Sequence, residues 1–368
     1  MEQIIITAEC NYKELDTWLQ GKNKVLLVCD TSFPFLSIKK YFDEREDRFV
    51  KFDEFQPNPL YESVVKGVEV YRREGCDSIV AIGGGSSIDV AKCIKLYSNL
   101  PGDGAYGVWL KNEIIPNSIP FLAVPTTAGT GSEATRYAVI YYQGNKQSIT
   151  SESCIPETIL LDSSTLKTLP IYQKKATMCD ALCHAIESFW SVNSTEESRV
   201  YSRSAIQGVL GNMDGYLMNT EDGNMGMLIA AHTAGKAINI TQTTAGHAMC
   251  YKITSLFGCA HGHAAMLCDR ILYPWMIKNT DRCIDSRGEE YISRMLDEIG
   301  QAMGCVDAVA GAEKMTEIFN NLELEIPIAT KEEYEELKTS VNLVRLKNHP
   351  IELTENIIDE LYHNILRK

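Results

Sequence analysis

The stretch "VAIGGGSSIDVAK", residues Val80 to Lys92, is the part of this chain that best predicts its fold. It is an apolar run followed by three glycines, two serines and helix-forming residues. A glycine turn at the start of a helix leaves backbone N–H groups free, and the positive end of the helix dipole points to the same place. We therefore expect a phosphate group to bind here. The alternative is a plain strand-to-helix turn, for which glycine is also well suited.

Short apolar runs alternate with helical patterns on both sides of this stretch, up to about residue 165. Apolar runs predict strands at 24–30, 77–85, 120–127 and 157–162, and periodic segments predict helices at 60–75 and 86–99. This alternation is typical of a parallel sheet covered by helices on both faces. From residue 165 onward the strand signal disappears and a period of 3.6 residues prevails. The sequence therefore predicts an α/β domain over 1–164 and an all-helical domain over 165–368.

Composition and charge limit the classes of partner. The chain has 368 residues, of which 45% are hydrophobic, and its formal net charge is -14. Such a charge argues against a nucleic-acid or an anionic-membrane surface, because both require clustered Lys and Arg. No stretch reaches the ~18 apolar residues of a membrane span, and the first ten residues lack the pattern of a signal peptide. The twelve cysteines form no CxxC pair, so we expect buried free thiols and a cytoplasmic protein.

Two further segments suit a nucleotide. Asp30 follows the first predicted strand, where a carboxylate can accept hydrogen bonds from a ribose diol and repel a 2'-phosphate, which favours NAD over NADP. The alternative for Asp30 is a cap on the following turn, "TSFPF". The loop "PTTAGTGSEAT", residues 125–135, combines hydroxyls with bare backbone. That combination suits a polyhydroxylated ligand, although a polar surface loop has a similar composition.

The helical half contains a candidate metal site. Asp180 and His184 are four residues apart and therefore project from one face of a helix. The segment 243–264 supplies His247, His261 and His263. Imidazoles combined with a carboxylate select Zn(II) or Fe(II), and such a set leaves a position open for a substrate. For any one of these histidines, a hydrogen-bonded place in the core is the alternative.

Taken together, these motifs resemble the iron-containing (group III) alcohol dehydrogenases. The resemblance is carried by "PNP" at 57–59, "GxDxIVAIGGGSxxDxAK" at 75–92, "PTTAGTGSEAT" at 125–135, "DALxHAIE" at 180–187, "HAM" at 247–249, "HGH" at 261–263 and the end of the chain at 348–363. It implies a Rossmann-like N-terminal domain and an all-helical C-terminal domain, the fold shared with dehydroquinate synthase. It also implies a homodimer, a nicotinamide cofactor and one divalent metal ion, Fe(II) or Zn(II).

The resemblance assigns roles to single residues. The metal ligands it implies are Asp180, His184, His247 and His261. The cofactor residues it implies are Gly84, Gly85 and Ser86 at the pyrophosphate, Asp30 at the ribose, Thr126, Thr127 and Thr130 near the nicotinamide half, and Lys146 at a cofactor ribose. The implied reaction is hydride transfer between the nicotinamide and a small alcohol or aldehyde, with the metal acting as a Lewis acid.

One position departs from the family pattern. Where the family usually has a second histidine after "HxMA", this chain has Tyr251, followed by Lys252. A proton relay would then have to use Tyr251, His263 or ordered water. Lys252 and Arg136 also add positive charge, which suggests an aldehyde with an anionic tail and resembles the phosphonoacetaldehyde reductase branch. The alternative is that Lys252 only solvates a helix face and the pocket accepts small neutral alcohols.

Two other interpretations remain open from the sequence. Zinc-dependent glycerol dehydrogenases and dehydroquinate synthases also combine NAD with a metal ion on a related fold. The second interpretation is a protein of a different class, a relative that still binds the cofactor but has lost catalytic activity and has a role in assembly. The intact set of metal-ligand candidates argues against that second possibility.

Overall fold

The computed structural model describes residues 3–9, 11–341 and 345–367. These residues form two compact units. Unit 1 contains Met1–Leu169 together with Asn219–Leu228, and unit 2 contains Pro170–Met218 and Ile229–Lys368. The division therefore falls a few residues after the predicted boundary at 164, and a short segment of the helical half belongs to unit 1.

Unit 1 is built on a six-stranded parallel sheet with the strand order β1-β8-β5-β4-β2-β3. The strands are β1 Ile4–Thr7, β2 Val25–Cys29, β3 Phe49–Phe52, β4 Ser78–Gly83, β5 Phe121–Pro125 and β8 Thr158–Leu161. The four predicted strands are confirmed as β2, β4, β5 and β8, whereas β1 and β3 were not predicted. All residues of β2, β4, β5 and β8 are buried, as expected for strands covered on both faces.

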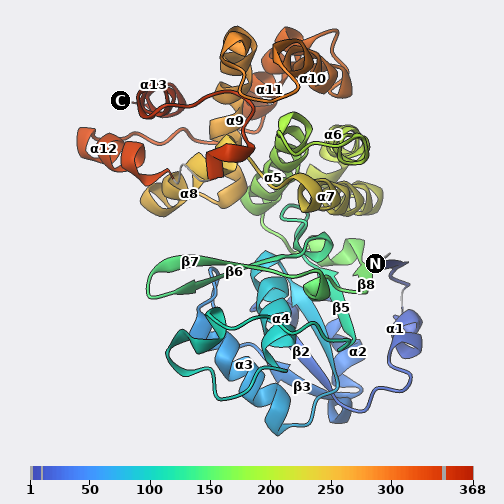
Figure 1. The fold of residues 1–368 in the computed structure, drawn as a ribbon. Helices are drawn as coiled ribbons and strands as arrows, with labels where there is room; N and C mark the ends of the chain where they lie inside the picture. Colours follow the sequence, from blue (N-terminus) through green and yellow to red (C-terminus); the bar gives the residue numbers. More distant parts are fainter. Residues whose placement is uncertain (1–2, 10, 342–344, 368) are drawn as a thin grey trace. The chain divides into compact units, whose positions relative to one another are not determined.

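Helices cover the two faces of this sheet. They are α1 Lys13–Trp18, α2 Lys39–Asp43, α3 Tyr61–Arg73 and α4 Gly85–Tyr97. Alternate residues of a strand point to opposite faces: Leu26 and Val28 pack with α3 and α4, and Val25 and Leu27 pack with α1 and α2. Figure 1 shows α3 and α4 along one side of the sheet. The predicted arrangement of a parallel sheet between two helical layers is confirmed.

An antiparallel hairpin follows the threonine-rich loop. It consists of β6 Tyr137–Tyr142 and β7 Asn145–Thr150, with Tyr141 opposite Lys146. The sequence analysis did not predict it. The hairpin turn uses Gln143 and Gly144, which both have positive φ angles, as two-residue hairpin turns of this kind require.

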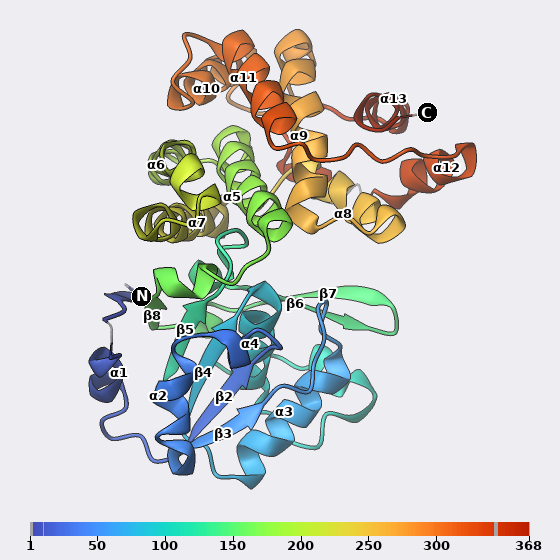
Figure 2. The same ribbon diagram turned by 180° about the vertical axis from the view of Figure 1, so that it is seen from behind.

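The regular structure of the described residues in unit 2 is helical, as predicted. The helices are α5 Ile171–Trp190, α6 Glu196–Leu217, α7 Glu221–Thr241, which begins in unit 1, α8 Ala245–Phe257, α9 His261–Lys278, α10 Glu289–Ala302, α11 Ala308–Asn321, α12 Lys331–Ser340 and α13 Glu355–Ile365. Helix α5 is buried on nearly every side from Met178 onward, and it packs against α6 and α9 (Figure 2). A polar side chain on this helix must therefore find its partners inside the protein.

No helix in the described part of the chain is long and apolar enough to cross a bilayer. Every cysteine among the described residues is free, and most of them are buried. Cys10 lies outside the described residues.

Candidate functional site

The glycine turn forms the junction between β4 and α4. Gly83 ends the strand with φ 156°, and Gly84 occupies the N-cap position of α4 without a side chain to cap it. A Cβ atom on Gly83 would lie 2.1 Å from Ser87 Oγ and 2.5 Å from Asp30 Oδ2. The close approach of these side chains therefore requires glycine at position 83, and the start of α4 offers backbone N–H groups to an anion.

Asp30, in the loop after β2, contacts both the glycine turn and its own turn. Its Oδ2 accepts hydrogen bonds from Ser87 Oγ at 2.9 Å and from Gly84 N at 3.4 Å. Its Oδ1 accepts from the N and Oγ of Ser32 at 2.9 and 2.5 Å. One carboxylate oxygen thus stabilises the following turn, and the other faces the glycine turn.

The threonine loop lies against the same turn. A Cβ atom on Gly84 would lie 3.3 Å from Thr127 Cγ2, and one on Gly85 would lie 3.0 Å from Thr130 Oγ1. Thr126 N donates to the Gly83 carbonyl at 3.0 Å. The structure therefore brings the predicted glycines and threonines together with Asp30. The predicted Ser86 belongs to the first turn of α4.

Two residues of α4 hold this loop, the buried Lys92 and the partly buried Asp89, and the sequence analysis gave them no role. Lys92 Nζ donates to the carbonyls of Ser132, Thr135 and Tyr137 at 2.6, 2.6 and 2.7 Å. Asp89 accepts hydrogen bonds from Ser132 Oγ at 2.6 Å and Val139 N at 2.9 Å. The sequence signal that could have identified them is their spacing of three residues within a helical motif, because it places both side chains on one face of the helix.

The predicted Lys146 on β7 interacts electrostatically with Asp89. Burial raises the pKa of Asp89, and the positive charges of Lys92 and Lys146 partly offset that effect. Lys146 therefore lies close enough to α4 to interact with the carboxylate of Asp89.

In unit 2, the four predicted metal ligands converge from three helices. Asp180 and His184 come from α5, His247 from α8 and His261 from the first turn of α9. His247 Nε2 is 3.4 Å and His261 Nε2 is 4.0 Å from Asp180 Oδ1. The ring of His184 is stacked on that of His247, with 4.4 Å between the centroids. Asp180, His184 and His247 are buried, whereas His261 is partly exposed.

The electrostatics of this cluster suit a cation. Burial would raise the pKa of Asp180, but His184, His247 and His261 together hold it well below its usual value. Burial lowers the pKa of His247, yet the carboxylates of Glu187 and Asp180 outweigh this effect and raise it to about 10. The site thus favours positive charge beside Asp180. Asp180, His247 and His261 each offer a ligand atom within 4.8 Å of the others, and this set of donors fits Fe(II) or Zn(II).

Glu187 is a further member of the cluster that received no role from the sequence. Its Oε1 contacts His247 Nδ1. Burial would raise the pKa of Glu187, but His247 and hydrogen bonds from Thr244 lower it to about 2. Glu187 follows Asp180 by seven residues, which places both on one face of α5. That spacing was the signal that could have identified it.

The glycine in "HGH" explains how α9 reaches the cluster. A Cβ atom on Gly262 would lie 2.1 Å from the Ala176 carbonyl and 2.5 Å from Asp180 Cβ, so only glycine allows this approach to α5. His263 is buried and makes other contacts. Its Nε2 is 2.8 Å from the Glu325 carbonyl, and its Nδ1 is 3.1 Å from Tyr172 Oη.

The remaining predicted residues differ in their surroundings. The ring of Tyr251 is stacked on that of His261, with the centroids 5.1 Å apart. Lys252 Nζ forms an ion pair with Glu336 on α12. In unit 1, Arg136 forms an ion pair with Glu152 at 2.7 Å. Tyr251 therefore lies directly beside the metal-ligand cluster, and both predicted cations have carboxylate partners.

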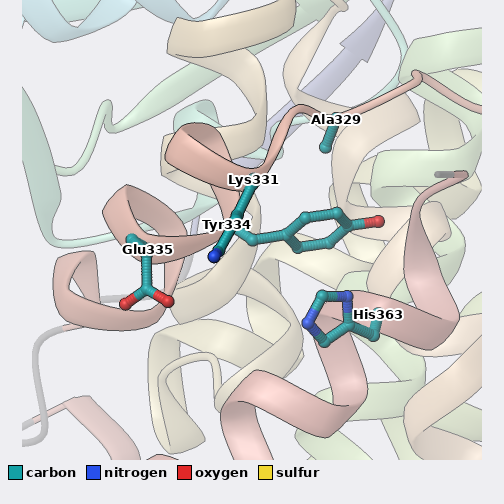
Figure 3. A pocket seen from close by; sticks show the side chains of 5 residues that line it. All are labelled: Ala329, Lys331, Tyr334, Glu335 and His363. Carbon is teal, nitrogen blue, oxygen red and sulfur yellow. The ribbon is translucent and has the colours of Figure 1, made fainter.

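A cavity of about 370 Å³ in unit 2 is lined by a different set of residues. These are Ala329, Lys331, Tyr334, Glu335 and His363. Figure 3 shows the rings of Tyr334 and His363 lying against one another, with their centroids 4.0 Å apart. The cavity is open to solvent and borders α12 and α13. None of these lining residues is among those predicted for catalysis or metal binding.

Comparison with known families identifies the chain. The model described as iron-containing alcohol dehydrogenase matches residues 3–163, and its C-terminal counterpart, described as Fe-containing alcohol dehydrogenase family, C-terminal, matches residues 174–366. The chain belongs to the iron-containing alcohol dehydrogenase family. This membership confirms the predicted fold class and the predicted function as an alcohol dehydrogenase or aldehyde reductase, in preference to the dehydroquinate synthase alternative.

Individual relatives of this chain have names that give different substrates. Alcohol dehydrogenase 4 of Schizosaccharomyces pombe is 30% identical over 84% of this chain and 72% of that protein. Phosphonoacetaldehyde reductase of Streptomyces viridochromogenes is 33% identical over 64% of this chain and 62% of that protein. Among solved structures, an iron-containing alcohol dehydrogenase of Thermotoga maritima has a TM-score of 0.80 and 26% identity over 100% of this chain and 98% of that one. Sulfoacetaldehyde reductase of Bifidobacterium kashiwanohense has a TM-score of 0.86 and 24% identity over 99% of this chain and 96% of that one, a likeness of fold.

Proposed function

We propose that this chain reduces short aldehydes that carry an anionic tail, with NADH as hydride donor and one ion of Fe(II) or Zn(II). The observation that carries the proposal is the convergence of Asp180, His247 and His261, each with a ligand atom within 4.8 Å of the others. His184, stacked on His247, would be the fourth ligand. A divalent ion bound there supplies Lewis-acid polarisation of the substrate oxygen.

The preference for NADH follows from Asp30. Its carboxylate adjoins the glycine turn at which a pyrophosphate would bind, through Gly84 N and Ser87. A negative charge at this place repels the additional phosphate of NADPH. Gly84, Gly85 and Ser86 would hold the pyrophosphate, with Thr126, Thr127 and Thr130 beside it and Lys146 at a ribose.

The reduction needs a hydride and a proton. Bound NADH would supply the hydride for the new C–H bond, the π electrons of the C=O bond would move to oxygen, and this chain must deliver a proton to that oxygen to complete the alcohol. The stacking of Tyr251 on His261 supports Tyr251 as the proton donor. His263 has less support for this role, because both of its ring nitrogens contact Tyr172 and a backbone carbonyl.

Lys252 is the proposed anchor for an anionic tail. Its partner Glu336 lies on α12, and their side chains are 28% and 51% exposed. An ion pair this exposed contributes at most about 1 kcal/mol to stability, so an anionic substrate can displace Glu336. The relation to a phosphonoacetaldehyde reductase supports the same substrate class.

The proposal extends to assembly and compartment. Strand β1 lies at the edge of the sheet and exposes Ile4 and Ile5, which supports a homodimer that covers this edge. The free cysteines of the described residues support a reducing compartment such as the cytoplasm.

Metal analysis tests the central claim. Wild-type protein loaded with Fe(II) or Zn(II) should bind one ion per chain, and His261→Ala should lose most of that ion together with the reductase activity. His263→Gln is the matched control, because it alters the neighbouring histidine of the same motif and should retain the ion. Full metal occupancy in His261→Ala would remove His261 from the ligands, and a wild-type chain that binds no divalent ion would overturn the proposal.

A further inference from the structure

The two ring nitrogens of His247 face two carboxylates of the same helix. Nε2 lies 3.4 Å from Asp180 Oδ1, and Nδ1 contacts Glu187 Oε1. Asp180 and Glu187 are separated by seven residues of α5, which is about two turns or ~10.5 Å along the helix axis. The imidazole of α8 therefore lies between two acids on one face of α5.

Glu187 also binds the backbone of the helix that carries His247. Its Oε1 accepts a hydrogen bond from His247 N at 2.9 Å, and its Oε2 accepts from Thr244 Oγ1 at 2.6 Å and from Thr244 N. Thr244 occupies the N-cap position of α8 but makes no side-chain capping bond of its own. Glu187 thus performs the capping function from another helix, and its negative charge suits the positive end of the helix dipole.

This group has little freedom to move. Glu187, Thr244 and His247 are at most 1% exposed. Trp190 Nε1 donates to Thr244 Oγ1 at 2.8 Å, so the hydroxyl proton is directed toward Glu187. A Cβ atom on Gly246 would lie 1.9 Å from Asp269 Oδ1 and 2.7 Å from Glu187 Oε1. The carboxylates of Asp269 and Glu187 therefore both approach the backbone of α8 at a position where only glycine fits.

We propose that Glu187 is a positioning residue that keeps a proton on Nδ1 of His247 and thereby leaves Nε2 for the metal ion. The inference rests on the proposed function, because it requires a metal ion beside Asp180. A hydrogen bond at one ring nitrogen fixes which nitrogen is available to a metal, and loss of such a partner weakens metal binding by roughly 10- to 100-fold.

The competing explanation is that Glu187 only caps α8. Two substitutions separate these roles. Glu187→Gln keeps the length of the side chain but removes its negative charge, and it replaces one carboxylate oxygen, an acceptor, by an NH2 group, a donor. Thr244→Val keeps the shape of Thr244 and removes its hydroxyl, so it weakens the cap while leaving the contact between Glu187 and His247 in place.

The measurement is the dissociation constant of Zn(II), determined by competition with a chelator, together with the melting temperature of the metal-free protein. We expect Glu187→Gln to bind Zn(II) about 10- to 100-fold more weakly, whereas Thr244→Val should melt at a lower temperature but bind within about threefold of wild type. Equal losses of affinity in both variants, or wild-type affinity in Glu187→Gln, would overturn the inference. Absence of Zn(II) binding by the wild type would instead overturn the proposed function.

NMR of the wild-type protein keeps the inference testable even if Glu187→Gln does not fold. With isotope-labelled histidine and bound Zn(II), the His247 ring should show a proton on Nδ1 and metal coordination through Nε2. Coordination through Nδ1 would contradict the role assigned to Glu187.

Discussion

Asp30 Oδ2 accepts a hydrogen bond from Ser87 Oγ at 2.9 Å, which connects the loop after β2 to the first turn of α4. The two residues are 57 positions apart in the sequence. Since β2 and β4 are neighbouring parallel strands, their carboxyl ends meet at one edge of the sheet. The acid that would discriminate between cofactors is thereby held against the turn that would bind their shared pyrophosphate.

Removing the charge of Asp30 should increase the use of NADPH. We expect Asp30→Asn to raise kcat/KM for NADPH about tenfold relative to NADH, because relief of one screened repulsion amounts to ~1.4 kcal/mol. Initial rates with each cofactor measure this ratio. Ser32→Ala is the control, since it removes a partner of Asp30 but keeps the charge, and its ratio should match wild type. A wild type that uses NADPH as well as NADH would show that Asp30 lacks this role.

Lys92 should matter for cofactor binding, and Lys95 offers a matched comparison. Both are buried lysines of α4, but Lys92 holds two carbonyls within the threonine loop and one directly after it, whereas Lys95 holds Asn117 and the Ile119 carbonyl. Replacing either residue by Met leaves buried or partly buried carbonyls without donors, which costs at most about 1–3 kcal/mol for each carbonyl. Both variants should therefore melt earlier, but only Lys92→Met should raise the Kd for NADH, measured by fluorescence, by about fivefold or more. Similar NADH affinities in the two variants would contradict the role of Lys92.

The substrate class can be tested at the pair Lys252 and Glu336. If Lys252 binds an anionic tail, kcat/KM for phosphonoacetaldehyde should exceed that for propanal, and Lys252→Met should reduce this preference about tenfold or more. Glu336→Gln should increase the preference, because it frees Lys252 from its carboxylate partner. A wild-type preference for propanal would exclude the anionic-tail substrate. A preference that persists in Lys252→Met would move the anchor to another cation, with Arg136 as the next candidate.

The buried side chain of His349 should make the free energy of unfolding depend on pH. It is fully buried near Trp190, and neither ring nitrogen has a hydrogen-bond partner among the described residues. Burial lowers its pKa to about 4, whereas the unfolded chain has a histidine pKa of about 6.5. Between these values the unfolded state binds more protons, so the free energy of unfolding should fall by up to about 3 kcal/mol as the pH decreases from about 6.5 to about 4.

Urea unfolding across this pH range checks the expectation. His349→Gln should have a smaller loss of stability at low pH than wild type. His363→Gln, at a partly exposed histidine, should keep the wild-type dependence. If the slopes of wild type and His349→Gln coincide, His349 is not the group responsible.

Several elements were predictable because their signals are local. The apolar run at residues 79–82, followed by three glycines, indicates a buried strand that turns into a helix, and the structure has this arrangement at residues 78–97. Strand β1 was missed because it is a short edge strand, and its side chains are mostly exposed. The hairpin of β6 and β7 was missed because its strands are only partly buried and do not alternate clearly between apolar and polar residues.

The sequence by itself determined the family, the parallel sheet and the residue types that could bind a metal ion, since each depends on the order and spacing of nearby residues. Only the tertiary structure decided which partners those residues have. It showed that Lys252 is paired with Glu336, that His263 contacts Tyr172 and that Glu187 reaches His247 across 60 positions of the chain. Such contacts depend on how helices pack, and a helix approaches another only as closely as its smallest residues allow. Gly246 allows Glu187 to approach α8, and Gly262 allows α9 to approach α5. The local sequence around each glycine does not show which side chain will lie against it.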